Sequence, residues 1–587
     1  MNDRPQQVPY GVSNFVDIRT NNLYYVDKTM YLPMIEDEAR YLFFTRPRRF
    51  GKSLLVSMMC AYYDCKLKDR FQELFGGLWI AQHPTPLQGK YLILYLDFSQ
   101  VGGDISKIEH RFDSYCSMRI NFFVQRYSDY YPADIATQIA NSESFADKLD
   151  LLCNYSAEQG YMLFLIIDEY DNFTNTILNE QGEAVYHAIT HADGFYRDIF
   201  KKFKGNFERI FMTGVSPVTL DDGTSGFNIG WNIATKPQFN NILGFTTSDV
   251  RTMFEYYKDQ GKLPADCDVE LAIKDMEPWY DGYCFSEDSL RGRDRVFNTD
   301  MVLYYLRNYM SYGCPPEQMI DPNTKMDYGK MQKLLQFDKL DGDRKGLINK
   351  IAEEGEIVCE LFDSFSAYQI PKVQFFPSLL YYYGMLTIKG TRGERLMLGI
   401  PNNNVRKQYY GYLLEDYQNR SYVNTMQLDD GFYEMAYEGE WRKCLQFMAD
   451  SYAKLSSVRD AIESERNLQG FFMAYFSMTN YYYFMAYFSM TNYYYTAPEL
   501  ELNHGFCDFF LLPDLTHYAT QHSYILELKV LHKGSTEEHA QKQWDDAIAQ
   551  IHSYAQAPRV EALRQGTQLH LIIMQFDGFQ LKRMEEV

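Results

Sequence analysis

Short continuous apolar runs, separated by stretches of helix length, dominate the first third of the chain. Four such runs predict buried strands, at Tyr41–Thr45, Tyr91–Asp97, Met162–Ile167 and Arg209–Thr213. A helix-like run at Lys52–Tyr63 follows the first of them directly. Strands that are apolar along their whole length are typical of a parallel sheet covered on both faces by helices. The pattern predicts an α/β domain, which we expect to span residues 1–245.

From about Gly244 the pattern becomes helical, and this middle region is expected to span residues 246–430. Phe375–Lys389 has the pattern of a helix that turns into a strand. The segment GTRGE at Gly390–Glu394 indicates a hairpin turn, with a return strand at Leu396–Ile400. A helix followed by a small hairpin predicts a winged-helix-like module, and the alternative is an ordinary helical linker with a β-hairpin.

The last region, residues 431–587, begins with helices and then becomes rich in strands. The predicted elements are strands at Glu499–Leu512 and Ser523–Val530, a helix at Ala540–Tyr554 and a strand at Gln568–Gln575. A mixed α/β domain of about 150 residues has a normal domain size.

One segment of this last region is duplicated. Phe472–Tyr483 (FMAYFSMTNYYY) is repeated without a change at Phe484–Tyr495. Solenoid repeats drift in sequence and need several copies, so two identical copies indicate a recent tandem duplication. A strand would keep its inside–outside alternation through an even-numbered insertion. A helix of about 3.6 residues per turn would return about 120° out of phase.

Size, charge and cysteine usage narrow the class of protein. A chain of 587 residues is too long for one hydrophobic core. The net charge of −21 means that any contact with nucleic acid must use a local patch. The ten cysteines show no CxxC or zinc-type Cys/His spacing, which favours free thiols in a reducing compartment. With neither a signal peptide nor an apolar stretch of ~18 residues, we expect a cytoplasmic protein without membrane association.

The first predicted strand runs into Arg46–Ser53 (RPRRFGKS), and a helix begins at once. In a phosphate-binding loop, backbone N–H groups and the helix N-terminus hold the phosphates. Lys52 would reach the β- and γ-phosphates, the Ser53 hydroxyl would bind Mg²⁺, and Gly51 would permit close backbone approach. The first position usually carries glycine, and here it is Arg46. The segment predicts nucleotide binding, and the alternative is a basic turn with a fortuitous GKS.

An apolar strand that ends in two acids supplies the second half of such a site. Leu163–Glu169 (LFLIIDE) would place Asp168 beside Mg²⁺ and Glu169 near the attacking water. At the ends of neighbouring strands, Asp97 could orient the site and Thr213 could sense the γ-phosphate. The alternative for these residues is a solvated or capping role at the end of a strand.

Six stretches of the chain carry a family resemblance. They are Tyr24–Ile35 (YYVDKTMYLPMI), Phe43–Met59 (FFTRPRRFGKSLLVSMM), Leu165–Phe173 (LIIDEYDNF), Phe211–Ala234, Ile242–Val250 and Trp279–Phe285. Together they resemble bacterial AAA-ATPase-like proteins that end in a PD-(D/E)xK nuclease-like domain. RPRRFGKS is the usual form of the loop in that family. The resemblance therefore counts Arg46 and Arg49 among the nucleotide-binding residues.

Two acids and a lysine in the last region form a second candidate site. Alternation in the strand YILELKV places Glu527 and Lys529 on one face, and Asp508 lies in the preceding strand-like run. Asp and Glu on adjacent strands can hold Mg²⁺, and a nearby Lys can orient water or neutralise developing charge. Phosphodiester hydrolysis needs this combination. The alternative is a solvent-facing salt bridge on a strand pair.

The resemblance adds a restriction-endonuclease-like fold and accessory residues to this site. The catalytic residues that it implies are Asp508, Glu527, Lys529, Glu465 and Gln550. Two features depart from the family pattern. Cys507 stands where the family commonly has arginine, and the duplicated segment falls between Glu465 and Asp508.

These observations predict an ATP-regulated nuclease with ATP and Mg²⁺ as cofactors and DNA or RNA as substrate. The expected metal ligands are Ser53, Asp168, Asp508 and Glu527. The alternative is a nucleotide-dependent switch or scaffold whose nuclease-like domain binds nucleic acid or a protein partner without cleavage, which the acidic charge and the altered spacing favour. AAA-type ATPases often use an arginine from a neighbouring subunit. A homo-oligomer would fit this, and no arginine of the sequence can be assigned that role.

Overall fold

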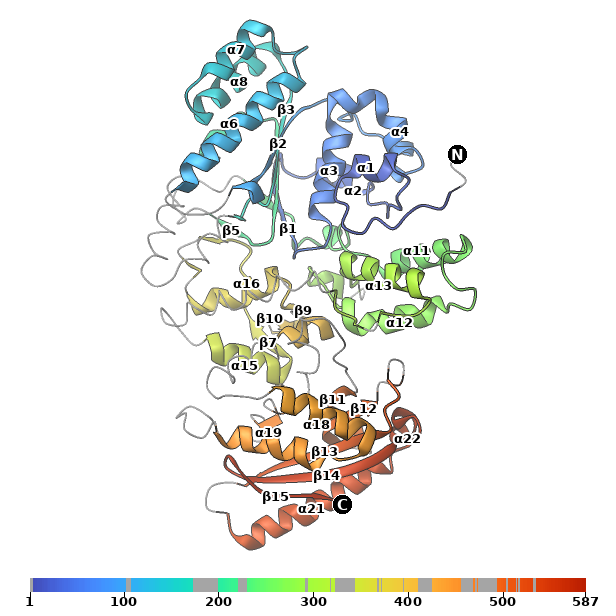
Figure 1. Ribbon diagram of the computed structural model, residues 1–587. Coiled ribbons are helices and arrows are strands. Elements are labelled where there is room, and N and C mark those ends of the chain that lie inside the picture. The colour runs from blue at the N-terminus through green and yellow to red at the C-terminus, as the bar shows by residue number, and fades with distance from the viewer. Residues whose placement is uncertain are drawn as a thin grey trace. The chain divides into compact units, whose positions relative to one another are not determined.

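A computed structural model shows the chain as two compact units (Figure 1). The first unit comprises residues 1–345 and 356–405, and the second comprises residues 346–355 and 406–587. The structure describes residues 4–101, 107–172, 199–219, 230–290, 294–316, 318–321, 344–366, 369–370, 372–393, 395–409, 425–454, 468–469, 472, 494–502, 505–513, 515, 518–531 and 535–587. The domain boundaries near residues 245 and 430 stay a prediction.

A five-stranded parallel sheet forms the centre of the first unit, in the order β2-β3-β4-β1-β6. Its strands are β1 (Tyr41–Thr45), β2 (Leu92–Asp97), β3 (Leu163–Asp168), β4 (Arg209–Gly214) and β6 (Trp231–Asn232). The predicted α/β architecture is confirmed, and the four apolar runs are the four long strands. The two-residue strand β6 is an addition, because a segment so short has no hydrophobic pattern of its own.

Helices cover both faces of this sheet, with α3 on one side and α6 on the other (Figure 1). The helices of this part are α1 (Phe15–Thr20), α2 (Tyr31–Glu36), α3 (Lys52–Tyr63), α4 (Phe71–Phe75), α5 (Trp79–Gln82), α6 (Ile108–Arg126), α7 (Ala133–Asn141) and α8 (Phe145–Gln159). The predicted helix at Lys52–Tyr63 is therefore confirmed. Because α3 begins directly after β1, the loop between them lies at the carboxyl edge of the sheet, where ligands of α/β proteins commonly bind.

The outward edge of β2 is closed by side chains of α6 and of the residue after it. The Ile93 amide donates to the Tyr127 hydroxyl at 3.0 Å, and the Asp97 amide donates to the Tyr115 hydroxyl at 2.8 Å. Between them, Arg119 Nε donates to the Tyr95 carbonyl at 3.1 Å. Successive outward-facing backbone groups of an edge strand thus have side-chain partners where a further strand would otherwise pair.

A block of three helices follows the sheet and has its own core. The helices are α11 (Thr247–Asp259), α12 (Val269–Tyr280) and α13 (Thr299–Tyr312). A capping box between Thr246 and Asp249 starts α11, and the Asn298 side chain caps α13. Buried residues from all three helices pack together, and Val26 of the N-terminal segment packs against them. These helices confirm the prediction that the middle region is helical.

The predicted helix and hairpin are also present in the first unit. Helix α16 (Phe376–Tyr382) precedes an antiparallel pair of strands, β9 (Thr387–Arg392) and β10 (Arg395–Gly399). Strand β7 (Glu356–Cys359) adds to β10, which makes a three-stranded antiparallel sheet. Helix α15 (Arg344–Glu354) precedes β7, and the short strands β5 (Val218–Thr219) and β8 (Phe365–Ser366) pair with each other.

The second unit is built on a mixed sheet in the order β11-β12-β13-β14-β15. Its elements are α18 (Thr425–Glu438), α19 (Arg442–Lys454), β11 (Tyr494–Leu502), β12 (Gly505–Pro513), β13 (His522–Leu531), α21 (Glu537–Ala555), α22 (Pro558–Arg564), β14 (Gln568–Asp577) and β15 (Gln580–Glu586). Only β13 and β14 are parallel, and α21 connects them. The predicted mixed α/β fold and its elements are confirmed, and β15 is an addition.

None of the helices within the described ranges has both the length and the apolar composition needed to cross a bilayer.

Candidate functional site

The loop between β1 and α3 has the backbone conformation of an anion-binding turn. Gly51 has φ of 96° and stands at the N-cap of α3, so that the first amides of the helix face the loop. Arg49 has φ of 66°, a left-handed conformation that is costly for a residue with a side chain. Contacts to the backbone carbonyl and to the side chain of Arg49 offset this conformational cost. The Thr299 hydroxyl donates to the Arg49 carbonyl at 2.6 Å, and Arg49 Nη1 lies 2.8 Å from Asp300 Oδ2.

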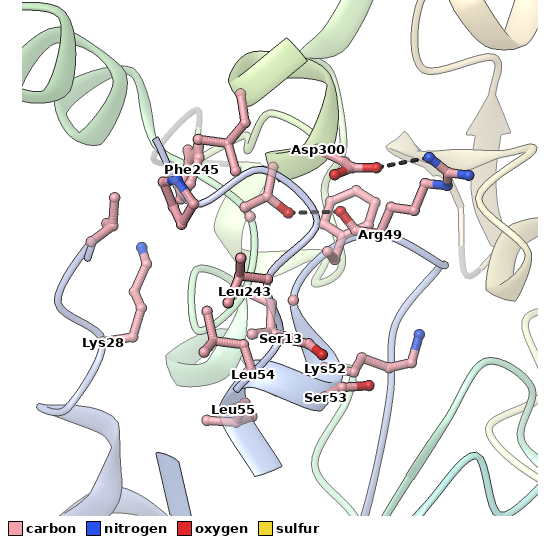
Figure 2. Close-up of a pocket in the computed structure, with 18 of the residues that line it drawn as sticks. Ser13, Lys28, Arg49, Lys52, Ser53, Leu54, Leu55, Leu243, Phe245 and Asp300 are labelled. Carbon is pink, nitrogen blue, oxygen red and sulfur yellow. Dashed lines mark hydrogen bonds and ion pairs between the residues drawn. The ribbon is translucent and has the colours of Figure 1, made fainter. Parts of the chain in front are cut away.

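A cavity of about 310 Å³ opens beside this loop (Figure 2). Polar and cationic groups line it, among them those of Lys28, Arg48, Arg49, Lys52 and Ser53. Apolar side chains line it as well, among them those of Val26, Leu243, Phe245, Met253 and Leu303. A volume of this size with both apolar and cationic lining is suited to a ligand of a few hundred Å³ that carries both a ring system and negative charge.

The strand end predicted to bind metal lies against the loop. Ser53 Oγ donates to Asp168 Oδ2 at 2.6 Å, although the two residues are 115 positions apart. Burial raises the pKa of Asp168 to about 6, with the Ser53 hydrogen bond opposing the shift and the Glu169 charge adding to it. The next residue, Glu169, has φ of 52° and lines the cavity. The structure therefore brings Ser53, Asp168 and Glu169 together.

Lys52 is buried and turned toward the loop itself. Its Nζ donates to the carbonyl oxygens of Arg46 and Pro47, each at 3.1 Å. Both acceptors are neutral, so a phosphate would be a stronger partner for this ammonium than the carbonyls that it contacts.

Arg46 lies behind the loop and is not among the residues that line the cavity. Its guanidinium donates to the carbonyls of Ala234 and Phe239 at 2.7 and 2.8 Å. It also lies over the rings of Phe44 and Phe285, with centroid distances of 4.6 and 4.1 Å. Burial lowers the pKa of Arg46 to about 10. The residue that replaces the usual first glycine thus braces the loop, whereas its predicted contact with nucleotide stays a prediction.

The other two strand-end residues lie at the same edge of the sheet. Asp97 is in register with Asp168 on the neighbouring strand, and its carboxylate accepts from the Ser99 amide at 2.9 Å. Thr213 is the second-last residue of β4, and its hydroxyl is buried without a hydrogen-bond partner in the described part of the chain. A buried hydroxyl of this kind can accept or donate to a ligand that enters beside it.

No role was predicted from the sequence for several residues around this site. Asp300 and Thr299 come from the start of α13. Leu243 and Asp171 lie in stretches that carry the family resemblance, but neither was assigned to the site. The Asp171 carboxylate accepts from the Val215 and Ser216 amides, directly after β4, at 3.1 and 2.7 Å. The tertiary fold brings Asp300, Thr299 and Leu243 to the cavity. The Asn298 cap marks where α13 begins, but not what its first turn contacts.

The second candidate site lies on β12 and β13. Lys529 Nζ is 2.8 Å from Glu527 Oε1, and Glu527 is 1% exposed. Asp508 accepts from the Leu528 amide at 2.5 Å and from Gln469. The structure thus brings Asp508, Glu527 and Lys529 to one end of a strand pair, as predicted from the strand alternation. The site is buried, and this argues against a solvent-facing salt bridge.

Of the two predicted accessory residues of this second site, Gln550 lies within the described residues. Gln550 lies on α21 and donates to the Tyr554 hydroxyl. Glu465 lies outside the described residues, as does most of the duplicated segment. Among the residues that the structure describes, no group of three or more His, Cys, Asp or Glu is arranged to hold a metal ion. Cys507 belongs to the core that packs around Trp544, so a charged arginine at this position would be buried there.

Comparison with known proteins gives a family description for both ends of the chain. Residues 9–224 match the family model described as a predicted AAA-ATPase, and residues 483–586 match that of the PD-(D/E)XK nuclease superfamily. Both parts of the resemblance are confirmed. The AAA-ATPase-like region contains the phosphate loop, Asp168 and Thr213. The nuclease-superfamily region contains Asp508, Glu527 and Lys529, and Glu465 precedes it.

Individual proteins that are similar to this chain include a curated relative and a solved structure. An "uncharacterized protein in vnfD 5'region" of Azotobacter chroococcum mcd 1 is 23% identical over 295 residues, which cover 49% of this chain and 50% of the relative. The match therefore spans about half the length of that relative. Among solved structures, the Aeropyrum pernix Orc1 protein in complex with DNA has 11% sequence identity and a TM-score of 0.23, with 66% of this chain and 90% of that chain covered.

Proposed function

We propose that the first unit binds and hydrolyses ATP with Mg²⁺, and that this controls a Mg²⁺-dependent phosphodiesterase in the second unit that acts on DNA or RNA. The observation that carries the first half is the 2.6 Å contact between Ser53 and Asp168. It joins the hydroxyl of a phosphate-binding loop to an acidic strand end in the arrangement that nucleotide-hydrolysing proteins use. The AAA-ATPase-like match over residues 9–224 supports it.

The residues around the loop fit a nucleotide with a divalent cation. Ser53 and Asp168 present two oxygens side by side, which are the donors that Mg²⁺ prefers. Bound there, Mg²⁺ would neutralise charge on the phosphates. The α3 N-terminus and Lys52 would hold the phosphate oxygens, Glu169 would orient the attacking water, and Thr213 would contact the terminal phosphate. The apolar side chains of the cavity would contact the base.

The carboxylate site supports the second half of the proposal. Asp508 and Glu527 would hold Mg²⁺, which would polarise the scissile phosphate. Lys529 would give up part of its contact with Glu527 to orient water or to stabilise the developing negative charge. Because Lys529 is only 2.8 Å from Glu527, it is within reach of any group bound to that carboxylate.

A second candidate function is a nuclease-like unit that binds nucleic acid or a protein partner without cleaving. It is favoured by the net charge of −21 and by the duplicated segment, which lengthens the connection between Glu465 and Asp508. It is also favoured by the partners that Asp508 already has in Leu528 and Gln469, since a metal would compete with them. In this case nucleotide binding in the first unit would still act as the switch.

The test uses the purified full chain with Mg²⁺, ATP and a panel of single- and double-stranded DNA and RNA. We expect ATP hydrolysis that Lys52→Ala reduces at least about 100-fold, the scale on which loss of a group that stabilises transition-state charge is felt. The matched control is Lys66→Ala, which removes a surface lysine paired with Asp129 outside the cavity. We also expect cleavage of at least one nucleic acid that depends on Mg²⁺ and changes with ATP. ATP hydrolysis without any cleavage would favour the second candidate, and failure to bind ATP would contradict the proposal.

A further inference from the structure

Three cations of the nucleotide cavity, those of Lys28, Arg49 and Lys52, have acidic or carbonyl partners within the protein. Lys28 Nζ is 2.8 Å from Asp249 Oδ2, and Arg49 Nη1 is 2.8 Å from Asp300 Oδ2. Figure 2 shows the second of these contacts at the rim of the cavity, on the same side as Lys52. Carboxylates of the protein therefore already contact two of the cations that the phosphates of a nucleotide would bind.

Both acids belong to the helical block α11–α13. Asp249 lies in the first turn of α11, and Asp300 lies in the first turn of α13. The three helices share one buried core, so they are expected to respond as a body to a force on any of their ends. Through Asp300 and Thr299, α13 contacts both the side chain and the backbone of Arg49.

We propose that Asp300 holds Arg49 in the nucleotide-free protein and that a phosphate of the bound nucleotide takes its place. The start of α13 is thereby released, so that the helical block responds to nucleotide occupancy. This rests on the proposed binding of ATP in the first unit. It makes Asp300 a positioning residue that competes with the nucleotide, and not a residue that binds it.

Charge and geometry favour the exchange. A phosphate chain carries more negative charge than one carboxylate and offers more acceptor oxygens, and arginine binds it through two parallel hydrogen bonds. The Arg49 and Asp300 side chains are 23% and 22% exposed, and both line the cavity, so a ligand can reach the pair. Because the pair is only partly buried, separating it costs less than breaking a fully buried ion pair.

The same helical block offers a matched control. Arg251 and Glu270 form an ion pair between α11 and α12, with side chains that are 38% and 56% exposed. Neither residue lines the cavity. A substitution in this pair changes the charge of the block by the same amount without touching the proposed exchange.

The experiment measures binding of a fluorescent ATP analogue with Mg²⁺ to the full chain. Asp300→Asn removes the competing charge and keeps the shape of the side chain, so we expect binding to tighten about fivefold, the scale of a partly exposed ion pair. Glu270→Gln is expected to leave the affinity unchanged. Hydrogen exchange at the start of α13 is expected to rise when the analogue binds to wild-type protein, and to be raised already in Asp300→Asn without nucleotide.

A double-mutant cycle separates competition for Arg49 from simple charge repulsion. In an Arg49→Gln background, Asp300→Asn should give no further gain in affinity. A gain of the same size in that background would overturn the exchange, because Asp300 would then act on the nucleotide directly. Unchanged affinity in Asp300→Asn, with normal binding by the wild type, would also overturn it and would leave the proposed ATP site standing. If the wild-type chain binds no analogue, both the exchange and the proposed function fail.

Discussion

The phosphate-loop site of the first unit and the carboxylate site of the second unit are assembled in different ways. The first draws on strands that all run in the same direction, so that the ends of β1, β3 and β4 meet at one edge of the sheet. The second draws on an antiparallel pair, in which the regular pairing recorded between β12 and β13 spans only Phe509–Leu511. Beyond it, the Asp508 side chain bonds the Leu528 amide.

This difference decides how far each site depends on distant parts of the chain. Parallel topology places the loop and the acidic strand end together once the strand order is set. An acid at the end of a short antiparallel pairing depends on the local register and on groups supplied by other segments, such as Gln469. A nearby substitution or insertion should therefore disturb the geometry of the second site more than that of the first.

The largest effect that would sharpen this comparison is expected from Lys529→Ala. If the second unit cleaves, loss of this charge should reduce cleavage about 100-fold, as for other groups that stabilise a transition state. Nucleotide hydrolysis in the first unit should remain. A nuclease assay and an ATPase assay on the same preparation check this. Lys582→Ala, which removes a lysine paired with Glu537 on the surface of the second unit, serves as the control. Full cleavage by Lys529→Ala would remove this residue from the catalytic site.

The next largest effect is expected when the usual first glycine is restored to the phosphate loop. Arg46→Gly would remove the guanidinium donor from the carbonyls of Ala234 and Phe239, of which the second keeps the Ile242 amide at 3.4 Å, and would empty the space beside the Phe44 and Phe285 rings. We expect the free energy of unfolding of the first unit to fall by about 3 kcal/mol, since buried acceptors would lose their partners. Denaturant unfolding followed by hydrogen exchange in β1 and β4 measures it. A stable Arg46→Gly variant with tighter nucleotide binding would contradict the bracing role.

A smaller effect is expected from pH on the second unit, through His522. His522 Nδ1 lies 2.9 Å from His570 Nε2, and His570 Nδ1 lies 2.7 Å from Glu586 Oε1. Burial lowers the pKa of His522 below its ordinary value of 6.5, and the nearby His570 adds to the shift, while Glu586 opposes it. The folded chain therefore binds fewer protons here than the unfolded chain does.

The sign of this pH effect follows from linkage. The stability that neutral His522 contributes is fully present above the unfolded pKa near 6.5 and is lost as pH falls below that value toward the lower folded pKa. Hydrogen exchange of β13 and β14 measured across this range should show the loss, and His522→Gln should flatten it. The same slope in the variant would assign the effect to another group.

The smallest effect is expected when one copy of the duplicated segment is deleted. Phe472 is buried and packs near Phe576, with ring centroids 6.0 Å apart, and Tyr494–Tyr495 open β11. Each copy begins with Phe and ends with Tyr-Tyr-Tyr, so removal of Phe484–Tyr495 leaves the same residue types at both ends. We therefore expect the equilibrium constant for unfolding and the cleavage rate each to change by no more than about twofold, the range of ordinary surface changes. A large gain in cleavage would show that the duplication restrains the second site.

The local sequence pattern was sufficient to predict the apolar strands and the sites whose residues follow one another in the chain. The four long strands of the first sheet are apolar except near their ends, and the residues of the loop follow one another in the chain. Glu527 and Lys529 were placed together by strand alternation alone. Strand β15 was not predicted because QLKRMEE is polar, as an edge strand can be, and a register shift interrupts its pairing with β14.

The remaining parts could not be predicted because they depend on tertiary contacts. Asp300 and Thr299 reach the cavity from the start of α13, and nothing in their own neighbourhood marks a ligand. Arg46 was grouped with the nucleotide-binding residues because it belongs to the loop motif. Its direction depends on Ala234 and Phe239, almost two hundred residues away, whose carbonyls accept from it.

The closed edge of β2 also limits how copies of this protein could assemble. Side chains from α6 and Tyr127 already engage the amides of Ile93 and Asp97 and the carbonyl of Tyr95. A second molecule could extend the sheet at this edge only after these groups had been displaced. Pairing of an added strand at the β2 edge of the first sheet is therefore disfavoured.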